Sequence, residues 1–233
     1  MEWLNALLSA EVLSALAAIV VIDIVLAGDN AIVIALAARS LPRHLQKRAI
    51  FWGTGGAIVV RIAMTAAVVW LLRIPGLMLA GGLVLTWIAV KLLAPAGEEA
   101  HGEVAASHNF WSALRTIVIA DAAMGLDNVL AVAGASHGSL GLVVAGLLIS
   151  IPIVVWGSTL VLAWIERFPW IVYIGAAVLG WTAAQMISGE PWMRERLEGA
   201  PALLVAIHVG VIGGILGWGL LRKRRVRTVT HVA

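Results

Sequence analysis

The sequence contains no cysteine and few charged residues. Among its 233 residues, the lack of cysteine excludes disulfides, thiolate metal sites and a cysteine nucleophile. Charged residues form only 12% of the chain, about half of what is usual in soluble domains, whereas hydrophobic residues form 61%. Mean hydropathy is +0.99. A soluble domain of this length cannot bury so much apolar surface, so we expect a protein whose solvent is lipid.

Basic residues are absent from most of the chain, although its net charge is +3. They lie in short segments between apolar runs rather than in one broad patch. That placement is typical of residues that set membrane orientation and argues against nucleic acid as a partner. The N-terminal stretch has no positive segment and carries Glu2 and Glu11, so we expect no cleaved signal peptide.

Seven apolar runs are long enough to cross about 30 Å of hydrocarbon as helices that rise about 1.5 Å per residue. The alternating hydrophobicity of a membrane barrel is absent from the sequence. We therefore predict an all-α membrane protein with seven transmembrane helices in a single polytopic domain, residues 1–233. The predicted spans are Val12–Ala38, Ile50–Leu72, Gly76–Ala94, Leu114–Ala135, Gly141–Ile165, Trp170–Ser188 and Pro201–Leu221.

The distribution of basic residues predicts the direction of crossing. If seven helices alternate, one side of the membrane receives most of the arginines and lysines, and the positive-inside rule makes that side the cytoplasm. This puts the N-terminus outside and the basic tail, residues 222–233, inside the cell. The cytoplasmic set is Arg39, Arg43, Lys47, Arg48, Arg115, Arg167, Arg222, Lys223, Arg224, Arg225 and Arg227, against Arg73, Arg194 and Arg196 on the other side.

The chain contains an internal repeat. The stretch DIVLAGDN from Asp23 matches DAAMGLDN from Asp121, since both read Asp-x5-Asp-Asn. A second match follows in the same order, between IPGLMLAGGLVLTWIAVKLL and FPWIVYIGAAVLGWTAAQMI. In that match Pro75, Gly81 and Trp87 correspond to Pro169, Gly175 and Trp181. Two matches in one order indicate a duplication.

Each copy of the repeat holds three predicted helices, in residues 12–94 and 113–188, and the helix at 201–221 lies outside it. Because three is odd, the second copy enters the membrane from the opposite side, which is the inverted-repeat architecture of many transporters. We expect the first and fourth helices to meet near the bilayer midplane. At about 1.5 Å per residue, this arrangement places Asp23 at the depth of Asp127 and Asp29 at the depth of Asp121.

Four aspartates and two asparagines within two apolar helices need a physical reason, because an ionised Asp in the bilayer centre costs roughly 2.5–3.5 kcal/mol. A purely structural role, as hydrogen bonds between helices, is one explanation. The other is a cation site, since Asp and Asn oxygens suit Mg²⁺, Ca²⁺ or Mn²⁺. We favour the cation site because the cluster is duplicated. The predicted metal ligands are Asp23, Asp29, Asn30, Asp121, Asp127 and Asn128.

Three further residues are predicted to support the site. Asp23 and Asp29 lie about 120° apart around a straight helix and cannot face one ion together. Gly28 and Gly125 either let the helices unwind locally or let neighbouring helices pack closely. Arg61 lies in the middle of the second span, too deep to reach water, so we expect one of the aspartates as its partner.

The two Asp-x5-Asp-Asn motifs, with SIPIVVWGS from Ser150 and WIAVKLL from Trp87, resemble the TerC family, in particular its short YjbE-type branch. The resemblance covers roughly residues 12–187. It implies a multi-pass inner-membrane protein related to the LysE-type exporters, in a family associated with manganese efflux, metal supply to exported proteins and tellurite resistance. It also implies that the six Asp and Asn positions form the family's motif.

We therefore expect a secondary transporter of the cell membrane, without catalytic residues or a prosthetic group, that exports divalent cations and most of all Mn²⁺ by exchange with protons. One alternative is a membrane scaffold whose polar cluster is structural. Another is an intramembrane aspartyl protease, although the Gly-x-Gly-Asp pattern of those enzymes is absent. The connection at residues 98–108 either gathers metal or is a solvated loop. It contains Glu98, Glu99, His101, Glu103 and His108. Oligomeric state is left open.

Overall fold

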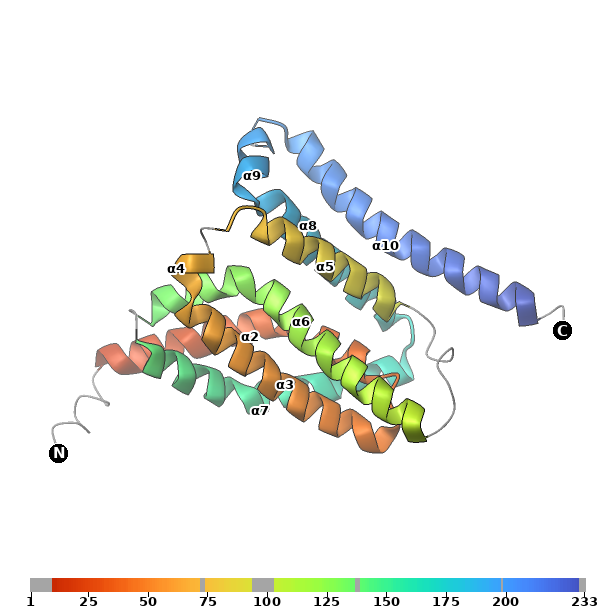
Figure 1. Cartoon of the computed structure of the whole chain (residues 1–233), viewed down its shortest axis with the longest axis horizontal. Coiled ribbons are helices and arrows are strands. Elements are labelled where there is room, and N and C mark those ends of the chain that lie inside the picture. Colours follow the sequence, from red (N-terminus) through yellow and green to blue (C-terminus); the bar gives the residue numbers. More distant parts are fainter. Residues whose placement is uncertain (1–9, 72–73, 94–102, 137–138, 198, 231–233) are drawn as a thin grey trace.

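The computed structural model describes residues 10–71, 74–93, 103–136, 139–197 and 199–230, and in these residues the only regular secondary structure is helical. Long helices run side by side through most of the molecule, while α10 lies along one edge (Figure 1). The helices are α2 (Ala10–Ala38), α3 (Arg43–Ala66), α4 (Val68–Leu71), α5 (Leu77–Leu92), α6 (Glu103–Ala135), α7 (Leu140–Arg167), α8 (Ile171–Gly189), α9 (Pro191–Leu197) and α10 (Pro201–Thr230).

Each predicted span overlaps one long helix, namely α2, α3, α5, α6, α7, α8 or α10. Within the described residues, α3, α7, α8 and the Pro201–Leu221 part of α10 are long and apolar enough to cross a membrane. The two arms of α2, Val12–Ile24 and Gly28–Ala38, together make a fifth candidate. The 16 residues of α5 reach only about 24 Å at about 1.5 Å per residue. The all-helical membrane fold is therefore confirmed, and the count of seven crossings stays a prediction.

Several helix ends differ from the predicted boundaries. The second helix was expected at Ile50–Leu72, but α3 begins at Arg43 directly after Pro42 and ends at Ala66. α6 begins at Glu103, well before the predicted Leu114, and α10 continues through the basic tail to Thr230. Hydropathy marks the part of a helix that fits hydrocarbon. Polar residues can continue the same helix beyond that part, because the backbone hydrogen bonds do not depend on the surroundings.

Apolar side chains cover the outside of the molecule. Of the 11 tryptophans, all but Trp3 lie in the described residues, and each of these is at least 44% exposed. Tryptophan is highly buried on average in soluble proteins, so this surface is suited to lipid and its interface. Three charged side chains lie inside instead, since Asp23, Arg61 and Asp121 are all buried. The distribution is that of a membrane protein with a polar interior.

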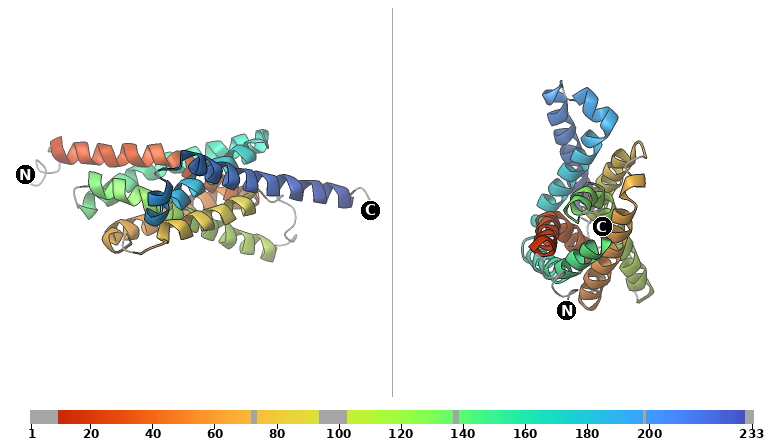
Figure 2. Two further views of the ribbon diagram at one scale, coloured as in Figure 1. Left: turned by 90° about the horizontal axis from the view of Figure 1, so that it is seen from above. Right: turned by 90° about the vertical axis from the view of Figure 1, so that its left-hand side faces the viewer.

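The helices pack in pairs drawn from the two predicted copies. α2 packs against α7, α3 against α6, and α5 against α8. Figures 1 and 2 show these helices as one bundle, with α10 outermost and next to α8. Glycines allow the close approaches. A Cβ atom on Gly53 would lie 2.7 Å from the side chain of Ile117, and one on Gly146 would lie 2.4 Å from that of Ile19.

The start of α5 is held by a buried carboxylate that the sequence analysis did not single out. Gly76 has a φ of 80°, which glycine adopts at little cost, and its N–H donates to Glu190 Oε1 at 2.7 Å. The N–H of Leu79 donates to Glu190 Oε2 at 3.3 Å. Glu190 follows directly after α8 and is 2% exposed. One carboxylate therefore satisfies free amides at the first turn of α5 and links that helix to α8.

Replacing Glu190 by alanine is expected to lower the free energy of unfolding by about 1–3 kcal/mol, because buried amides lose their acceptors. Thermal unfolding of the purified protein in detergent measures the change. Glu195→Ala is the matched control, since that carboxylate belongs to α9 and is exposed. Equal melting temperatures for the two variants would show that the Glu190 cap contributes nothing.

Candidate functional site

Arg61 lies at the centre of the polar interior. It is carried by α3, is 5% exposed, and donates from Nη1 to Asp23 Oδ1 of α2 and from Nη2 to Asp121 Oδ1 of α6. The backbone carbonyl of Arg61 accepts from Thr65 Oγ1 at 2.8 Å. Asp23 and Asp121 are the first aspartates of the two motif copies. A single guanidinium thus joins equivalent positions of both copies, which agrees with the expectation that Arg61 pairs with an aspartate.

The charges in this cluster do not balance. When both are ionised, Asp23 and Asp121 bring two negative charges to the one positive charge of Arg61. An ionised Asp29 adds to this imbalance, because its half-buried side chain lies close enough to interact electrostatically with Arg61 and Asp121. In a medium of low dielectric constant an uncompensated negative charge is costly and strongly attracts a cation. The cluster therefore has the electrostatic character of a cation site.

The helix that carries Asp23 and Asp29 bends between them. The axis of α2 turns by 47° from Val12–Ile24 to Gly28–Ala38. Past the bend, the backbone N–H of Asn30 donates to Asp29 Oδ1 at 2.8 Å. α2 is helical throughout, so the bend takes the place of the local unwinding that was one predicted role of Gly28. A bend removes the straight-helix constraint that kept the two aspartates about 120° apart.

Neither glycine of the motif serves close helix packing, which was the other predicted role. A Cβ atom on Gly28 would meet no atom within 4 Å. On Gly125 it would reach only the flexible methyl end of Met64, at 4.0 Å. The packing explanation is therefore wrong for Gly28 and unsupported for Gly125. Gly28 leaves exposed backbone next to Asp29, whereas Gly125 is buried with little in contact range of a Cβ atom.

Among the side chains that the structure describes, four buried polar atoms have no hydrogen-bond partner. They are Asn30 Oδ1, Thr54 Oγ1, Arg61 Nε and Asp121 Oδ2. Buried polar atoms are normally paired, so each of these four atoms is a polar position inside the bundle that the described side chains do not satisfy. Three of the four are oxygens, the ligands that hard divalent cations prefer. Thr54 was missed by the sequence analysis, although it lies seven residues before Arg61 and thus on the same face of α3.

The six predicted ligands are only partly brought together. Asp23 and Asp121 meet through Arg61, Asp29 interacts electrostatically with Arg61 and Asp121, and Asn30 and Asn128 are buried. The side chains of Asp127 and of the Glu and His residues at 98–108 lie outside the described part, although α6 begins at Glu103 within that connection. The predicted pairing of Asp23 with Asp127 therefore stays a prediction. Within the described part, no three Asp, Glu or His side chains are grouped closely enough to hold a metal ion.

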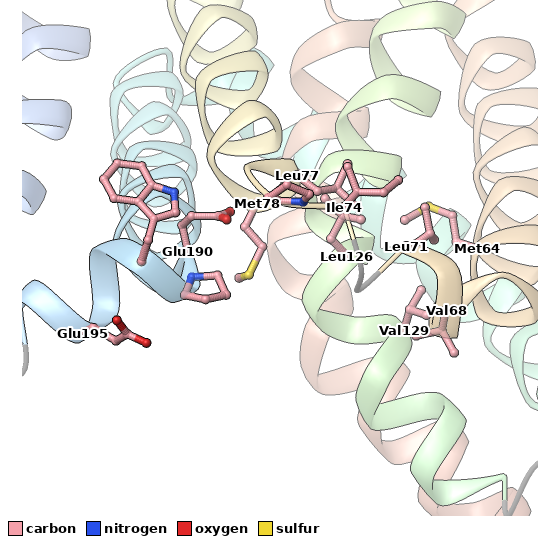
Figure 3. Close-up of a pocket in the computed structure, with 13 residues that line it drawn as sticks. Met64, Val68, Leu71, Ile74, Leu77, Met78, Leu126, Val129, Glu190 and Glu195 are labelled. Atoms are coloured by element: carbon pink, nitrogen blue, oxygen red, sulfur yellow. The ribbon is translucent and has the colours of Figure 1, made fainter.

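A cavity of about 420 Å³ opens beside the second motif copy. Leu126 and Val129 of α6 line it, and these residues flank the Asp127–Asn128 pair. Figure 3 shows Met64 and Val68 on one side of the cavity, with the carboxylates of Glu190 and Glu195 on the other. It is lined by Met64, Val68, Leu71, Ile74, Pro75, Leu77, Met78, Leu126, Val129, Glu190, Pro191, Trp192 and Glu195. The cavity is therefore mainly apolar, with two carboxylates at its edge, and none of Asp23, Arg61 and Asp121 lines it.

Comparisons with known proteins agree with the membrane fold. A sequence model described as "Integral membrane protein TerC family" matches residues 8–227. "Uncharacterized membrane protein YjbE" of Bacillus subtilis is 46% identical over 175 residues, which cover 75% of this chain and 79% of the relative. "UPF0053 inner membrane protein YgdQ" of Escherichia coli K12 is 28% identical over 171 residues, covering 66% and 72%. No solved structure matches the chain.

Proposed function

Because the chain belongs to the TerC family of integral membrane proteins, we propose that it is a secondary transporter of divalent metal cations, with Mn²⁺ as the main substrate. The observation that carries this proposal is the buried cluster in which Asp23 and Asp121, from two copies of one motif, converge on Arg61. Ionisable side chains inside a membrane protein usually mark an ion path. Their duplication fits a site formed at the interface of two repeats.

The packing of the helices supports an inverted repeat. In the two copies, α2 corresponds to α6, α3 to α7 and α5 to α8. The packing of α2 against α7 is therefore repeated as the packing of α6 against α3, and the two remaining helices, α5 and α8, pack against each other. The close contacts follow the same exchange, since Gly146 of α7 packs on Ile19 and Gly53 of α3 packs on Ile117. Each isoleucine lies four residues before the first aspartate of its motif. In the proposed topology all seven long helices cross the membrane, with the N-terminus outside and the C-terminus in the cytoplasm.

Oxygen ligands favour Mn²⁺, Mg²⁺ or Ca²⁺ over Zn²⁺ and Cu²⁺, because the motif offers no histidine or cysteine. Export of a divalent ion against an inside-negative potential of 100 mV costs about 4.6 kcal/mol, at about 2.3 kcal/mol per charge. Exchange of two protons for one Mn²⁺ removes that cost because it moves no net charge. The exchange requires carboxylates that bind the metal ion in one step and protons in the next, and the aspartates of the cluster can do both.

The two alternatives receive less support. An aspartyl protease needs two carboxylates that share a proton at close range. Here the guanidinium of Arg61 lies between Asp23 and Asp121 and donates a hydrogen bond to each. A scaffold explains a buried polar cluster, but it gives no reason for polar atoms such as Asn30 Oδ1 to be left without partners.

Reconstitution into liposomes tests the proposal. Purified protein in vesicles with an imposed proton gradient is expected to accumulate Mn²⁺ on the acidic side and to dissipate the gradient as Mn²⁺ moves. Parallel assays with Mg²⁺ and Ca²⁺ give the selectivity, and protein-free vesicles give the leak. Mn²⁺ movement that leaves the proton gradient intact would refute proton exchange. Absence of any cation movement would refute the transporter.

A further inference from the structure

Arg61 has no counterpart in the second copy of the repeat. The copies are offset by 98 residues at Asp23 and Asp121, and by 94 residues at Pro75 and Pro169. The equivalent of Arg61 therefore falls within residues 155–159, which read Val-Trp-Gly-Ser-Thr and carry no positive charge. The aspartates are duplicated, whereas the cation that joins them is single. Arg61 is thus a single cation between two duplicated aspartates, and a single metal ion bound by both copies would have the same position.

Arg61 and a metal ion compete for the same two carboxylates. The two terminal guanidinium nitrogens already donate to Asp23 Oδ1 and Asp121 Oδ1, so Arg61 occupies the space between the copies that a cation bound by both aspartates needs. A dication at this point would also face the positive charge of Arg61 directly, and at low dielectric constant that repulsion is strong. Ion and guanidinium cannot both lie between the two carboxylates.

The bonding of Arg61 is incomplete for a permanent structural bridge. Its Nε and the second oxygen of Asp121 have no partners among the described side chains, although both are buried. A guanidinium offers five donors, and a buried arginine in a structural role normally uses most of them. Partial bonding lowers the free-energy cost of moving the guanidinium away from the two carboxylates, because fewer hydrogen bonds are lost.

Resting on the proposed transport function, we propose that Arg61 is a built-in counter-cation. It binds Asp23 and Asp121 while the carrier is empty, and the divalent cation displaces it on binding. An arginine that takes the place of the ion keeps a cation between the two carboxylates in both states. The empty carrier then never exposes two bare carboxylates to a medium of low dielectric constant.

The affinity of the Arg61→Gln variant for Mn²⁺ tests this inference. If Arg61 competes with the ion, its removal is expected to tighten Mn²⁺ binding by about tenfold or more, since two carboxylates lose their internal cation. If Arg61 instead only holds the two helices together, or binds alongside the ion, the variant binds Mn²⁺ equally or more weakly. Either of these results overturns the inference. Calorimetric titration of the purified protein in detergent with Mn²⁺ measures the affinity.

Two further variants serve as controls for this experiment. Arg48→Gln removes an exposed arginine from the same helix and is expected to bind Mn²⁺ like the wild type. Arg61→Lys keeps a positive charge but cannot reach both carboxylates in the same forked manner, so its affinity should fall between wild type and Arg61→Gln. If Arg61→Gln does not fold, tighter binding by Arg61→Lys supports the inference and unchanged or weaker binding overturns it. Failure of the wild type to bind Mn²⁺ would count against the proposed function itself.

Discussion

Asp29→Asn is expected to reduce Mn²⁺ transport in reconstituted vesicles by about a hundredfold or more, since a charged ligand contributes about 2–3 kcal/mol that a neutral amide does not replace. The side chain is half-buried and accepts a hydrogen bond from the N–H of Asn30. Unlike Asp23 and Asp121, it has no hydrogen bond to Arg61 among the described contacts. Of the described carboxylates in the cluster, Asp29 is therefore the one most available to a cation.

The substitution separates function from folding because asparagine is nearly isosteric with aspartate. Its Oδ1 still accepts from the N–H of Asn30, so the melting temperature should change little. Glu195→Gln neutralises an exposed carboxylate and serves as the matched control with normal transport. If the polar cluster were only structural, Asp29→Asn would keep its activity. Full transport by this variant at normal expression would remove Asp29 from the site and favour a scaffold.

Gly82→Ala is expected to give the largest loss of stability from a single methyl group, about 1–3 kcal/mol for overpacking a tight contact. A Cβ atom at Gly82 would lie 2.8 Å from the backbone oxygen of Ala183 and 2.7 Å from the side chain of Ile187. The backbone of α8 cannot move out of contact by changing rotamer, as a side chain can. The methyl group therefore forces α5 and α8 apart, and these helices form one of the main packing pairs of the bundle.

Two other glycines provide a graded comparison in thermal unfolding. At Gly81 the nearest atom to a new Cβ would be the flexible methyl end of Met186, at 2.6 Å, so Gly81→Ala should cost less than Gly82→Ala. At Gly213 nothing lies within 4 Å, and alanine should be neutral or slightly stabilising in this helix. The expected order of melting temperatures is Gly213→Ala, then Gly81→Ala, then Gly82→Ala. A Gly82→Ala variant as stable as Gly213→Ala would show that α5 and α8 are less closely packed than described.

The helical segments and the family were accessible from the sequence for physical reasons. Apolar runs of about 20 residues have few other uses, and each predicted span coincides with a long helix. The predicted boundaries differ from the structure at helix ends such as Arg43 and Glu103, where polar residues continue a helix beyond the apolar run. The duplicated motif was also visible, because repeated polar residues stand out against an apolar background.

The sequence by itself determined that the chain is an all-helical membrane protein with polar residues repeated at Asp23 and Asp121, since composition and spacing fix hydrophobicity and approximate depth. Only the tertiary structure decided that both aspartates bind Arg61, that α2 bends beside Gly28, and that Glu190 holds the start of α5. Spacing along a helix gives the face and height of a side chain. The neighbour that it meets depends on how helices tilt and rotate against one another, and that is settled by close contacts between residues far apart in the chain, such as Gly146 with Ile19.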